Sequence, residues 1–267
     1  MRDVSEHAGF NLGFDADARS VSSDAGFSFQ RVTRYQDEMR PVLRSPEALQ
    51  PGAPYYEVFY MQEAPGAGRT DLDRLHLTYG PVLLPPGAIA GEFVKTSGHY
   101  HPDMPGSTLS YPEIYTGLYG RLLLFLQRRD RNAPDTPLHC AVIELAPGVT
   151  VAVPPDYAHV LINPSDEPAL MAGLYGTDFK PDYREVVAHQ GLAWYLVQGG
   201  GDYVAEPNPR YVNAPALERV RNLTGTIFEP PDDQALPVWE AFQRNPDRYA
   251  FLSQSRAAAD YFARWLP

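Results

Sequence analysis

Ten short apolar runs between residues 55 and 197 limit most strongly how this chain can fold. Each run is rich in β-branched, aromatic or leucine residues and is bounded by Pro, Gly or Asp. Their spacing of roughly ten to fifteen residues predicts an antiparallel sandwich or barrel. The predicted strands span 55–61, 74–80, 91–101, 113–120, 121–127, 138–145, 149–153, 159–163, 169–176 and 192–197.

Local signals give three finer expectations for these strands. Gly120-Arg121 separates two apolar runs and predicts a tight hairpin. The run 121–127 is apolar on both faces, as expected of a central strand covered on both sides. The glycine-rich segment 198–209 either ends this body or forms a hairpin tip that leads into a last strand.

Helical periodicity is visible only near the C-terminus. Residues 236–254 carry one apolar stripe that Pro246 interrupts, and residues 255–266 carry apolar side chains at i, i+3 and i+4 spacing. We therefore predict a mainly β barrel flanked by two other parts. The expected ranges are an N-terminal arm packed on the barrel at 1–54, the barrel at 55–205, and a C-terminal extension with helices at 206–267.

Composition excludes several classes of protein. The net charge of −11, with no cluster of Lys and Arg to offset it, argues against nucleic-acid binding. Cys140 is the only cysteine, so no internal disulfide is expected. The N-terminus lacks the basic and apolar regions of a signal peptide, and no apolar run approaches the ~20 residues that span a bilayer. We expect a soluble cytoplasmic protein with no membrane partner.

Two motifs carry side chains that suit a metal ion. His99 and His101 are two residues apart, so a strand would point both to one face, where Glu113 could join them from a neighbouring strand. The second motif, GVTVAVPPDYAHVLIN, places His159 as a fourth ligand. Three imidazoles and a carboxylate suit one divalent transition metal.

Strand alternation predicts which other polar residues near these motifs face the metal site. Strict alternation puts Lys95 and Ser97 on the ligand face, whereas a bulge at Gly98 would put Thr96 and Gly98 there. His76 alternates with Arg74 and Thr78, so all three could face the cavity. Asp103 and the arginines of RRDRN, at 128–132, are interpreted as loop charges without a chemical role.

The paired motifs resemble those of the cupin superfamily, whose fold is a double-stranded β-helix, or jelly-roll barrel. The segments FVKTSGHYHP, YPEIYTGLYGRLLLFLQ, VPPDYAHVLINPSDEP and GLYGTDFKPDYREV resemble, more closely, the cupin-type glucose-6-phosphate isomerases of archaea and some bacteria. The resemblance covers about residues 55–205. It implies a homodimeric enzyme of glycolysis and gluconeogenesis with one divalent ion per subunit, such as iron, manganese, nickel or zinc.

The resemblance also implies roles for individual residues. The metal ligands would be His99, His101, Glu113 and His159, and Glu113 with Tyr115 would be catalytic. The residues in contact with the sugar phosphate would be Thr78, Thr96, Gly98, Tyr115, Tyr175 and Tyr183.

Two departures from the family's pattern affect these roles. Eleven residues, 102–112, separate His101 from Glu113, where family members have a short loop. Pro181 stands where members often carry a histidine. A phosphate or proton-transfer contact would then be missing or come from elsewhere, with Lys180 and His76 as candidates. For the phosphate itself, Lys95 and Lys180 are the candidate cations.

The expected reaction is the interconversion of glucose 6-phosphate and fructose 6-phosphate. Either Glu113 moves a proton between C1 and C2 through an enediol, or a metal-assisted hydride shift occurs and Glu113 is only a ligand. The alternatives are an Fe(II) dioxygenase with the same ligands, a mannose-phosphate isomerase or epimerase, and a sugar-phosphate-binding cupin without catalytic activity.

Overall fold

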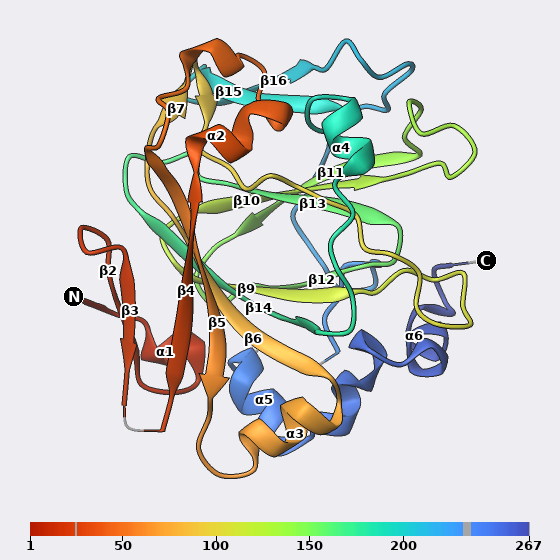
Figure 1. The fold of residues 1–267 in the computed structure, drawn as a ribbon. Helices are drawn as coiled ribbons and strands as arrows, with labels where there is room; N and C mark the ends of the chain where they lie inside the picture. Colours follow the sequence, from red (N-terminus) through yellow and green to blue (C-terminus); the bar gives the residue numbers. More distant parts are fainter. Residues whose placement is uncertain (25, 232–235, 267) are drawn as a thin grey trace.

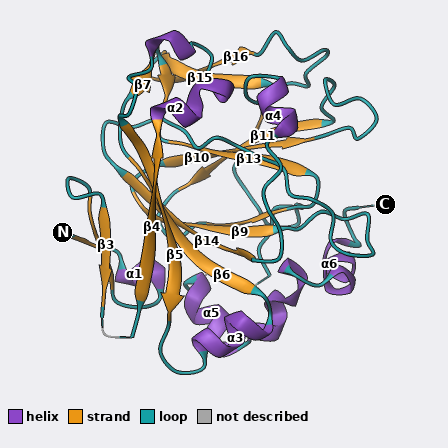
Figure 2. Ribbon diagram, viewed as in Figure 1, coloured by secondary structure: helices purple, strands orange, loops and turns teal. Residues whose placement is uncertain are grey.

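A large β-sheet facing two smaller ones forms the body of the chain in the computed structural model, which describes residues 1–24, 26–231 and 236–266 (Figures 1 and 2). The larger sheet has six antiparallel strands in the order β12-β9-β14-β6-β5-β4. Residues 232–235 and 267 of the expected C-terminal extension lie outside the described residues. The strands of this sheet are β4 (Ser28–Tyr35), β5 (Pro54–Glu63), β6 (Leu77–Leu84), β9 (Glu113–Tyr119), β12 (Thr150–Val153) and β14 (Ala169–Gly176).

The opposite side is formed by two smaller sheets of four strands each. Their orders are β13-β10-β11-β17 and β16-β15-β8-β7, and β17 is the parallel neighbour of β11. The first sheet contains β10 (Leu122–Arg128), β11 (His139–Leu145), β13 (Tyr157–Ile162) and β17 (Glu218–Val220). The second contains β7 (Ala88–Ile89), β8 (Glu92–Phe93), β15 (Trp194–Gly199) and β16 (Asp202–Pro207).

The chain passes repeatedly between the two sides. From β9 in the larger sheet it crosses to β10 and β11, returns for β12, crosses again for β13 and returns for β14. This alternation is the winding of a jelly roll and confirms the mainly β barrel. β10 is buried along almost its whole length between β13 and β11, as expected of a central strand.

The tight hairpin expected at Gly120-Arg121 is wrong. β9 pairs with β12 and β14, and β10 pairs with β11 and β13, so the turn joins strands of different sheets. A sequence with two adjacent apolar runs cannot distinguish a hairpin from such a crossover, because both need a turn between buried strands. In contrast, 198–209 does form a hairpin, in which Gly199 pairs with Asp202 around Gly200-Gly201.

Helices occur earlier in the chain than the sequence indicated. The early helices are one or two turns long, too short to produce an apolar stripe. The range predicted as a strand at 74–80 contains the end of one of them, and its strand begins only at Leu77. They are α1 (Ser5–Ala8), α2 (Gln36–Met39), α3 (Gly68–Arg74) and α4 (Arg184–Ala188), with 3₁₀ turns η1 (Arg40–Val42) and η2 (Pro46–Ala48).

The C-terminal helices pack beneath the larger sheet (Figure 1). They are α5 (Val238–Arg244), the 3₁₀ segment η3 (Pro246–Leu252) and α6 (Ser255–Phe262), so the helical pattern breaks at Pro246 as predicted. Trp239 is 1 % exposed and its ring lies 5.6 Å from that of Tyr79 in β6. This second core supports the sheet from outside the barrel.

The N-terminal residues are tied to the same sheet. A three-stranded sheet of β1 (Arg2–Asp3), β2 (Leu12–Asp15) and β3 (Ser20–Ser23) lies beside β4. The buried carboxylate of Glu57 in β5 accepts bonds from Arg19 at 2.5 Å and Thr33 at 2.6 Å. β4 itself pairs with β5, so the six-stranded sheet begins within residues 1–54.

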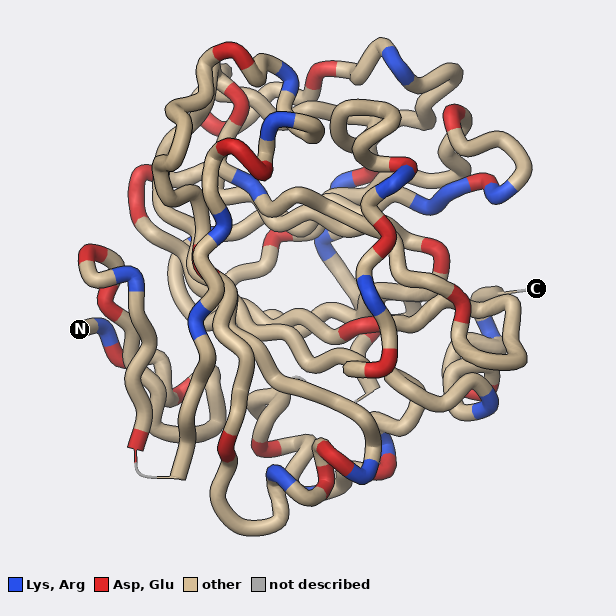
Figure 3. Tube along the Cα trace, in the orientation of Figure 1, with Lys and Arg blue, Asp and Glu red and all other residues tan. Residues whose placement is uncertain are grey.

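Charges of both signs are spread along the chain rather than gathered on one face (Figure 3). None of the described helices is long and apolar enough to cross a membrane.

Candidate metal centre

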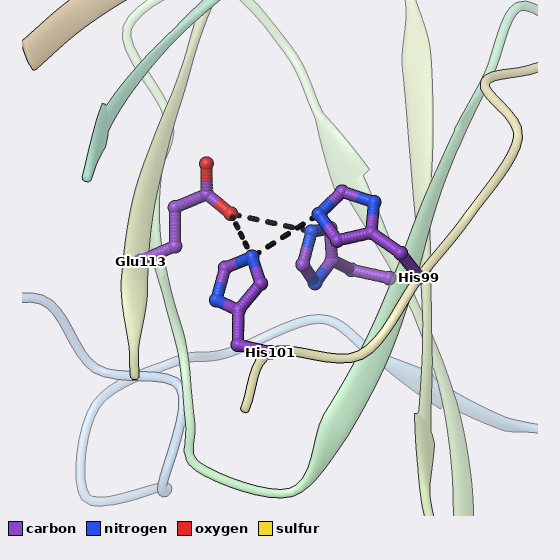
Figure 4. A group of neighbouring side chains, drawn as sticks. His99, His101 and Glu113 are labelled. Carbon is purple, nitrogen blue, oxygen red and sulfur yellow. Dashed lines mark hydrogen bonds and ion pairs between the residues drawn. The ribbon is translucent and has the colours of Figure 1, made fainter. Parts of the chain in front are cut away.

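Three imidazoles and one carboxylate converge between the two sheets (Figure 4). The Nε2 atoms of His99 and His101 lie 3.1 Å apart. Glu113 Oε2 lies 3.5 Å from His101 Nε2 and 3.2 Å from His159 Nε2. One donor atom from each of the four residues lies within 4.8 Å of the others. The structure therefore brings together all four predicted ligands.

The four donors come from opposite sides of the barrel. Glu113 is the first residue of β9 in the larger sheet, and His159 lies in β13 of a smaller one. The segment with His99 and His101 runs beside β13, where His159 N donates to His99 O at 3.3 Å. The site thus depends on both sheets being held at their observed separation.

The strand expected at 91–101 is interrupted. Only Glu92–Phe93 is regular strand, and isolated bridges follow at Lys95 and His99. Gly98 has φ +75°, and a Cβ there would lie 2.4 Å from Val160 Cγ2. Because of this break, neither form of alternation describes the segment: Thr96, Ser97 and Gly98 all line the cavity described below.

Several donor atoms at the site lack a hydrogen-bond partner among the described residues. His159 is 2 % exposed, yet both its ring nitrogens, together with Glu113 Oε2, lack a hydrogen-bond partner among the described residues. A buried polar group of this kind is costly unless something binds it. The donor set of three imidazoles and one carboxylate, meeting at one point, fits a divalent transition metal ion.

Burial also keeps two of the imidazoles, those of His99 and His101, in the neutral form that a metal requires. It lowers the pKa of His101 to about 4. It holds the pKa of His99 well below its usual range, and the neighbouring rings of His159 and His101 add to this effect. His101 Nδ1 lies 2.9 Å from the carbonyl oxygen of Tyr111, which can only accept, so Nδ1 carries the hydrogen and Nε2 offers its lone pair.

A cavity of about 620 Å³ opens beside the four donors, within the size range of sites for small molecules. All six residues expected to contact substrate line it, and hydroxyl groups are frequent among them. These residues are Thr78, Thr96, Gly98, Tyr115, Tyr175 and Tyr183.

The aromatic hydroxyls of this wall stay protonated. Burial raises the pKa of Tyr115 and that of Tyr175 well above their usual range, and raises the pKa of Tyr183 to about 12. The Tyr115 ring stands edge-on to His159 at 5.5 Å, and the Tyr183 ring lies 5.3 Å from His99. All three can therefore donate hydrogen bonds to a ligand near neutral pH.

The cations expected from the sequence do not line the cavity. Lys95 is buried elsewhere, where its Nζ donates to Val42 O at 2.7 Å and pairs with Glu92 at 3.3 Å. Lys180 is exposed and outside the lining. Among the candidates at 74–78, Thr78 lines the cavity, whereas His76 pairs with Asp178 and Arg74 with Asp71 and Asp247 at the surface.

Arg34 and Arg69 supply the positive charge of the described lining, and the sequence analysis missed both. Arg69 is committed to Asp73 and to the carbonyl of Met61. Arg34 is half-buried, and among the described residues its guanidinium bonds through Nη1 alone, to Glu38 at 2.9 Å. A signal did exist: Gln30, Val32 and Arg34 alternate along one face of β4, opposite the alternating Tyr56, Val58 and Tyr60 of β5.

Alanine at Gly98 should destabilise the protein and impair metal binding. The side chain would meet Val160 and require an unfavourable positive φ, so we expect a loss of about 3 kcal/mol in the free energy of unfolding. Denaturant unfolding and zinc titration of the metal-free protein measure the two effects. The control is Gly66→Ala, which has a similar φ of +65° but nothing within 4 Å, and should cost only about 1 kcal/mol. Equal losses in the two variants would contradict the packing argument.

Sequence comparison identifies relatives over the same part of the chain. The profile of the family described as "Glucose-6-phosphate isomerase (GPI)" matches residues 33–212. The glucose-6-phosphate isomerase of Thermococcus litoralis is 31% identical over 156 residues, which are 58% of this chain and 72% of that protein. The glucose-6-phosphate isomerase of Pyrococcus abyssi is 30% identical, again over 58% of this chain and 72% of that protein.

Other similarities are more distant. A protein of Rhizobium meliloti called "Putative glucose-6-phosphate isomerase 1" is 26% identical over 52% of this chain and 60% of its own. Among solved structures, oxalate oxidase in complex with glycolate is 19% identical over 38% of this chain and 41% of its own, with a TM-score of 0.29. Bacillus subtilis oxalate decarboxylase is 16% identical over 48% of this chain and 27% of its own, with a TM-score of 0.33.

Proposed function

The chain belongs to the glucose-6-phosphate isomerase family, and on this basis we propose that it interconverts glucose 6-phosphate and fructose 6-phosphate at the centre described above. The observation that carries the proposal is a set of four convergent metal donors, three of which line a cavity whose wall also carries hydroxyl groups. A sugar phosphate needs such donors along its length, because each of its hydroxyls loses water on binding.

His99, His101, Glu113 and His159 would hold the divalent ion. When bound, such an ion supplies Lewis-acid stabilisation to the oxygens on C1 and C2 of the sugar. Which of iron, manganese, nickel or zinc serves is set by availability as much as by these ligands.

The cavity wall would hold the sugar chain. Tyr115, Tyr175 and Tyr183 are protonated donors, and Thr78 offers another hydroxyl on the wall of β6. Thr96 Oγ1 accepts from Leu161 N at 3.0 Å and can still donate its own hydrogen to a ligand. These groups position the substrate so that its C1 and C2 lie at the metal centre.

We propose Glu113 as the group that moves the proton between C1 and C2. It is the one carboxylate among the described residues that line the cavity, and the three imidazoles beside it are ligands. A carboxylate held by a cation is a weak base, so Glu113 would have to loosen from the ion during the proton transfer. Tyr115, on the same face of β9, is placed to hydrogen-bond the reacting oxygens.

Arg34 takes the role in phosphate binding that the sequence suggested for Lys95 or Lys180. Its side chain lines the cavity together with Tyr56 and Tyr183, and its charge acts on both tyrosines. Among the described residues, Nε and Nη2 of Arg34 have no hydrogen-bond partner, so both can donate to phosphate oxygens.

The competing functions fit the cavity less well. An Fe(II) dioxygenase would use the same donors. In this cavity, however, two arginines and several hydroxyls lie among the apolar side chains, and these groups suit an anionic substrate that carries hydroxyls. A sugar-phosphate-binding protein would have the same wall without turnover. The resemblance also supports a cytoplasmic homodimer acting in glycolysis or gluconeogenesis, and we propose both on that ground.

The direct test is the conversion of fructose 6-phosphate to glucose 6-phosphate. We expect the metal-stripped protein to be inactive and activity to return with one or more of Fe²⁺, Mn²⁺, Ni²⁺ and Zn²⁺. His159→Ala should lower kcat/KM by at least about 100-fold with the same metals, because the centre loses a buried ligand. Bound metal without turnover would reject the isomerase and leave the oxygenase and binding-protein functions, and mannose 6-phosphate as substrate tests the epimerase alternative.

Replacing Arg34 should weaken substrate binding more than turnover. For Arg34→Gln we expect KM for fructose 6-phosphate to rise about 10- to 100-fold, since a charge-assisted bond is worth about 1.5–3 kcal/mol. Arg31→Gln is the control, because Arg31 lies on the other face of β4 and donates to the carbonyls of Ala18 and Arg19. An unchanged KM in Arg34→Gln would remove this residue from the phosphate site.

Isotope exchange separates the two routes for hydrogen transfer. If Glu113 carries the proton, turnover in D₂O should introduce solvent deuterium at C1 or C2 of the product, because a carboxylic acid exchanges with solvent. Mass spectrometry of the hexose phosphates measures the label. Product without deuterium would exclude a base that exchanges with solvent during turnover and would favour direct transfer of hydrogen between the carbons.

A further inference from the structure

The loop 102–112 connects two of the metal donors. Its eleven residues begin directly after His101 and end directly before Glu113. Any movement of this loop is therefore transmitted to both ligands. A loop of this length needs bonds of its own to keep them in place.

Internal contacts close the loop on itself. Met104 N donates to Leu109 O at 2.9 Å, and Tyr111 N donates to Pro102 O at 3.1 Å across the base of the loop. The side chain of Met104 is 1 % exposed and packs into the core that includes Tyr111. The loop is consequently a compact unit rather than an open flap.

The base of this unit holds the ring of His101. The carbonyl of Tyr111 accepts from His101 Nδ1 at 2.9 Å. The ring of Phe179 stacks on Tyr111 at 4.5 Å and lies 4.4 Å from His101. The position and the tautomer of the His101 ring therefore both depend on where the loop places Tyr111.

Arg131, from the loop between β10 and β11, fastens this unit to the barrel. Its guanidinium donates to both carboxylate oxygens of Asp103, at 2.8 and 2.6 Å, and to the carbonyl of Thr108 at 2.9 Å. It also donates to Asp156 at 2.6 Å. One side chain thus joins the loop to the turn before β13.

Asp156 completes the connection to a third ligand. Its backbone N–H donates to Ser110 Oγ at 2.7 Å, and Arg129 donates to its carboxylate at 3.1 Å. Three residues further on, in β13, lies His159. A single network therefore links the segments that carry His101, Glu113 and His159.

We propose that Arg131 is a positioning residue for the metal centre: through Asp103 and Asp156 it holds the 102–112 loop where its backbone orients His101. Isolated surface ion pairs contribute little, but this guanidinium bonds three groups on two segments in fixed geometry. The inference rests on the metal site of the proposed function and is independent of the reaction.

The test compares two arginines that each bridge two carboxylates. Arg131→Gln removes the link described above, whereas Arg74→Gln removes a similar bridge between Asp71 and Asp247, none of which lines the cavity or bonds a metal donor among the described residues. Competition with a chromophoric chelator measures the Zn²⁺ affinity of the metal-free full-length chains. We expect affinity to fall about tenfold in Arg131→Gln, the low end of the effect of outer-shell partners, and to stay unchanged in Arg74→Gln.

A second measurement reports on His101 itself. In ¹H–¹⁵N spectra of the metal-free wild type, the His101 ring should carry its hydrogen on Nδ1, and in Arg131→Gln it should show a mixture of tautomers. Arg131→Lys keeps the charge without the fork and should recover only part of the affinity. If Arg131→Gln does not fold, Asp103→Asn weakens the same link at its other end and should show the same two effects in smaller measure.

The outcomes are distinct. Unchanged Zn²⁺ affinity and tautomer in folded Arg131→Gln would overturn the inference while leaving the proposed function intact. Equal losses in Arg131→Gln and Arg74→Gln would overturn it too, because the effect would then be one of general stability. A wild type that binds no metal would overturn the proposed function and this inference together, whereas metal binding without isomerase activity would reject only the function.

Discussion

The separation of the two sheets is the constraint on which the site depends. Glu113 projects from the larger sheet and His159 from a smaller one, and their side chains meet at 3.2 Å between them. Facing sheets are kept apart by the side chains that fill the space. Here that filling includes Leu124 and Leu126 of β10, which are fully buried and lie on the same face of their sheet as His159, the partner of Leu126. A change of spacing by one methylene group would therefore be felt at the metal donors.

The same arrangement of the sheets explains why an open cavity lies beside a closed core. Where strands carry large apolar side chains, the sheets close on each other and form the core. Beside the four donors, glycines and hydroxyl-bearing residues take their place, as at Gly80, Gly173 and Thr78, and the space remains open. The open region thus combines polar groups with apolar side chains such as Val82 and Met171, a combination typical of small-molecule sites.

The strand positions and the metal ligands can be predicted from local patterns in the sequence. Strand positions follow from runs of apolar residues between turn signals, and His99-x-His101 with PPDYAHV predicts the ligands because motif and strand coincide. Arg34 was missed, since the pairing of β4 with β5 brings it to the cavity from a segment far from either motif. The sequence pattern at 128–132 indicated solvated loop charges. In the structure, however, Arg131 bonds Asp103 and Asp156 and so joins three separate loops.

The sequence by itself determined the mainly β barrel, the four donors and the hydroxyl-bearing residues around them, because period-two patterning and short motifs are local properties of the chain. Only the tertiary structure decided which strands pair, that Gly120 leads from one sheet to the other, that Lys95 is buried away from the cavity, and that Arg34 faces it. Those features depend on contacts between residues distant in sequence, where many pairings satisfy the same local pattern and the packing of the whole barrel selects one.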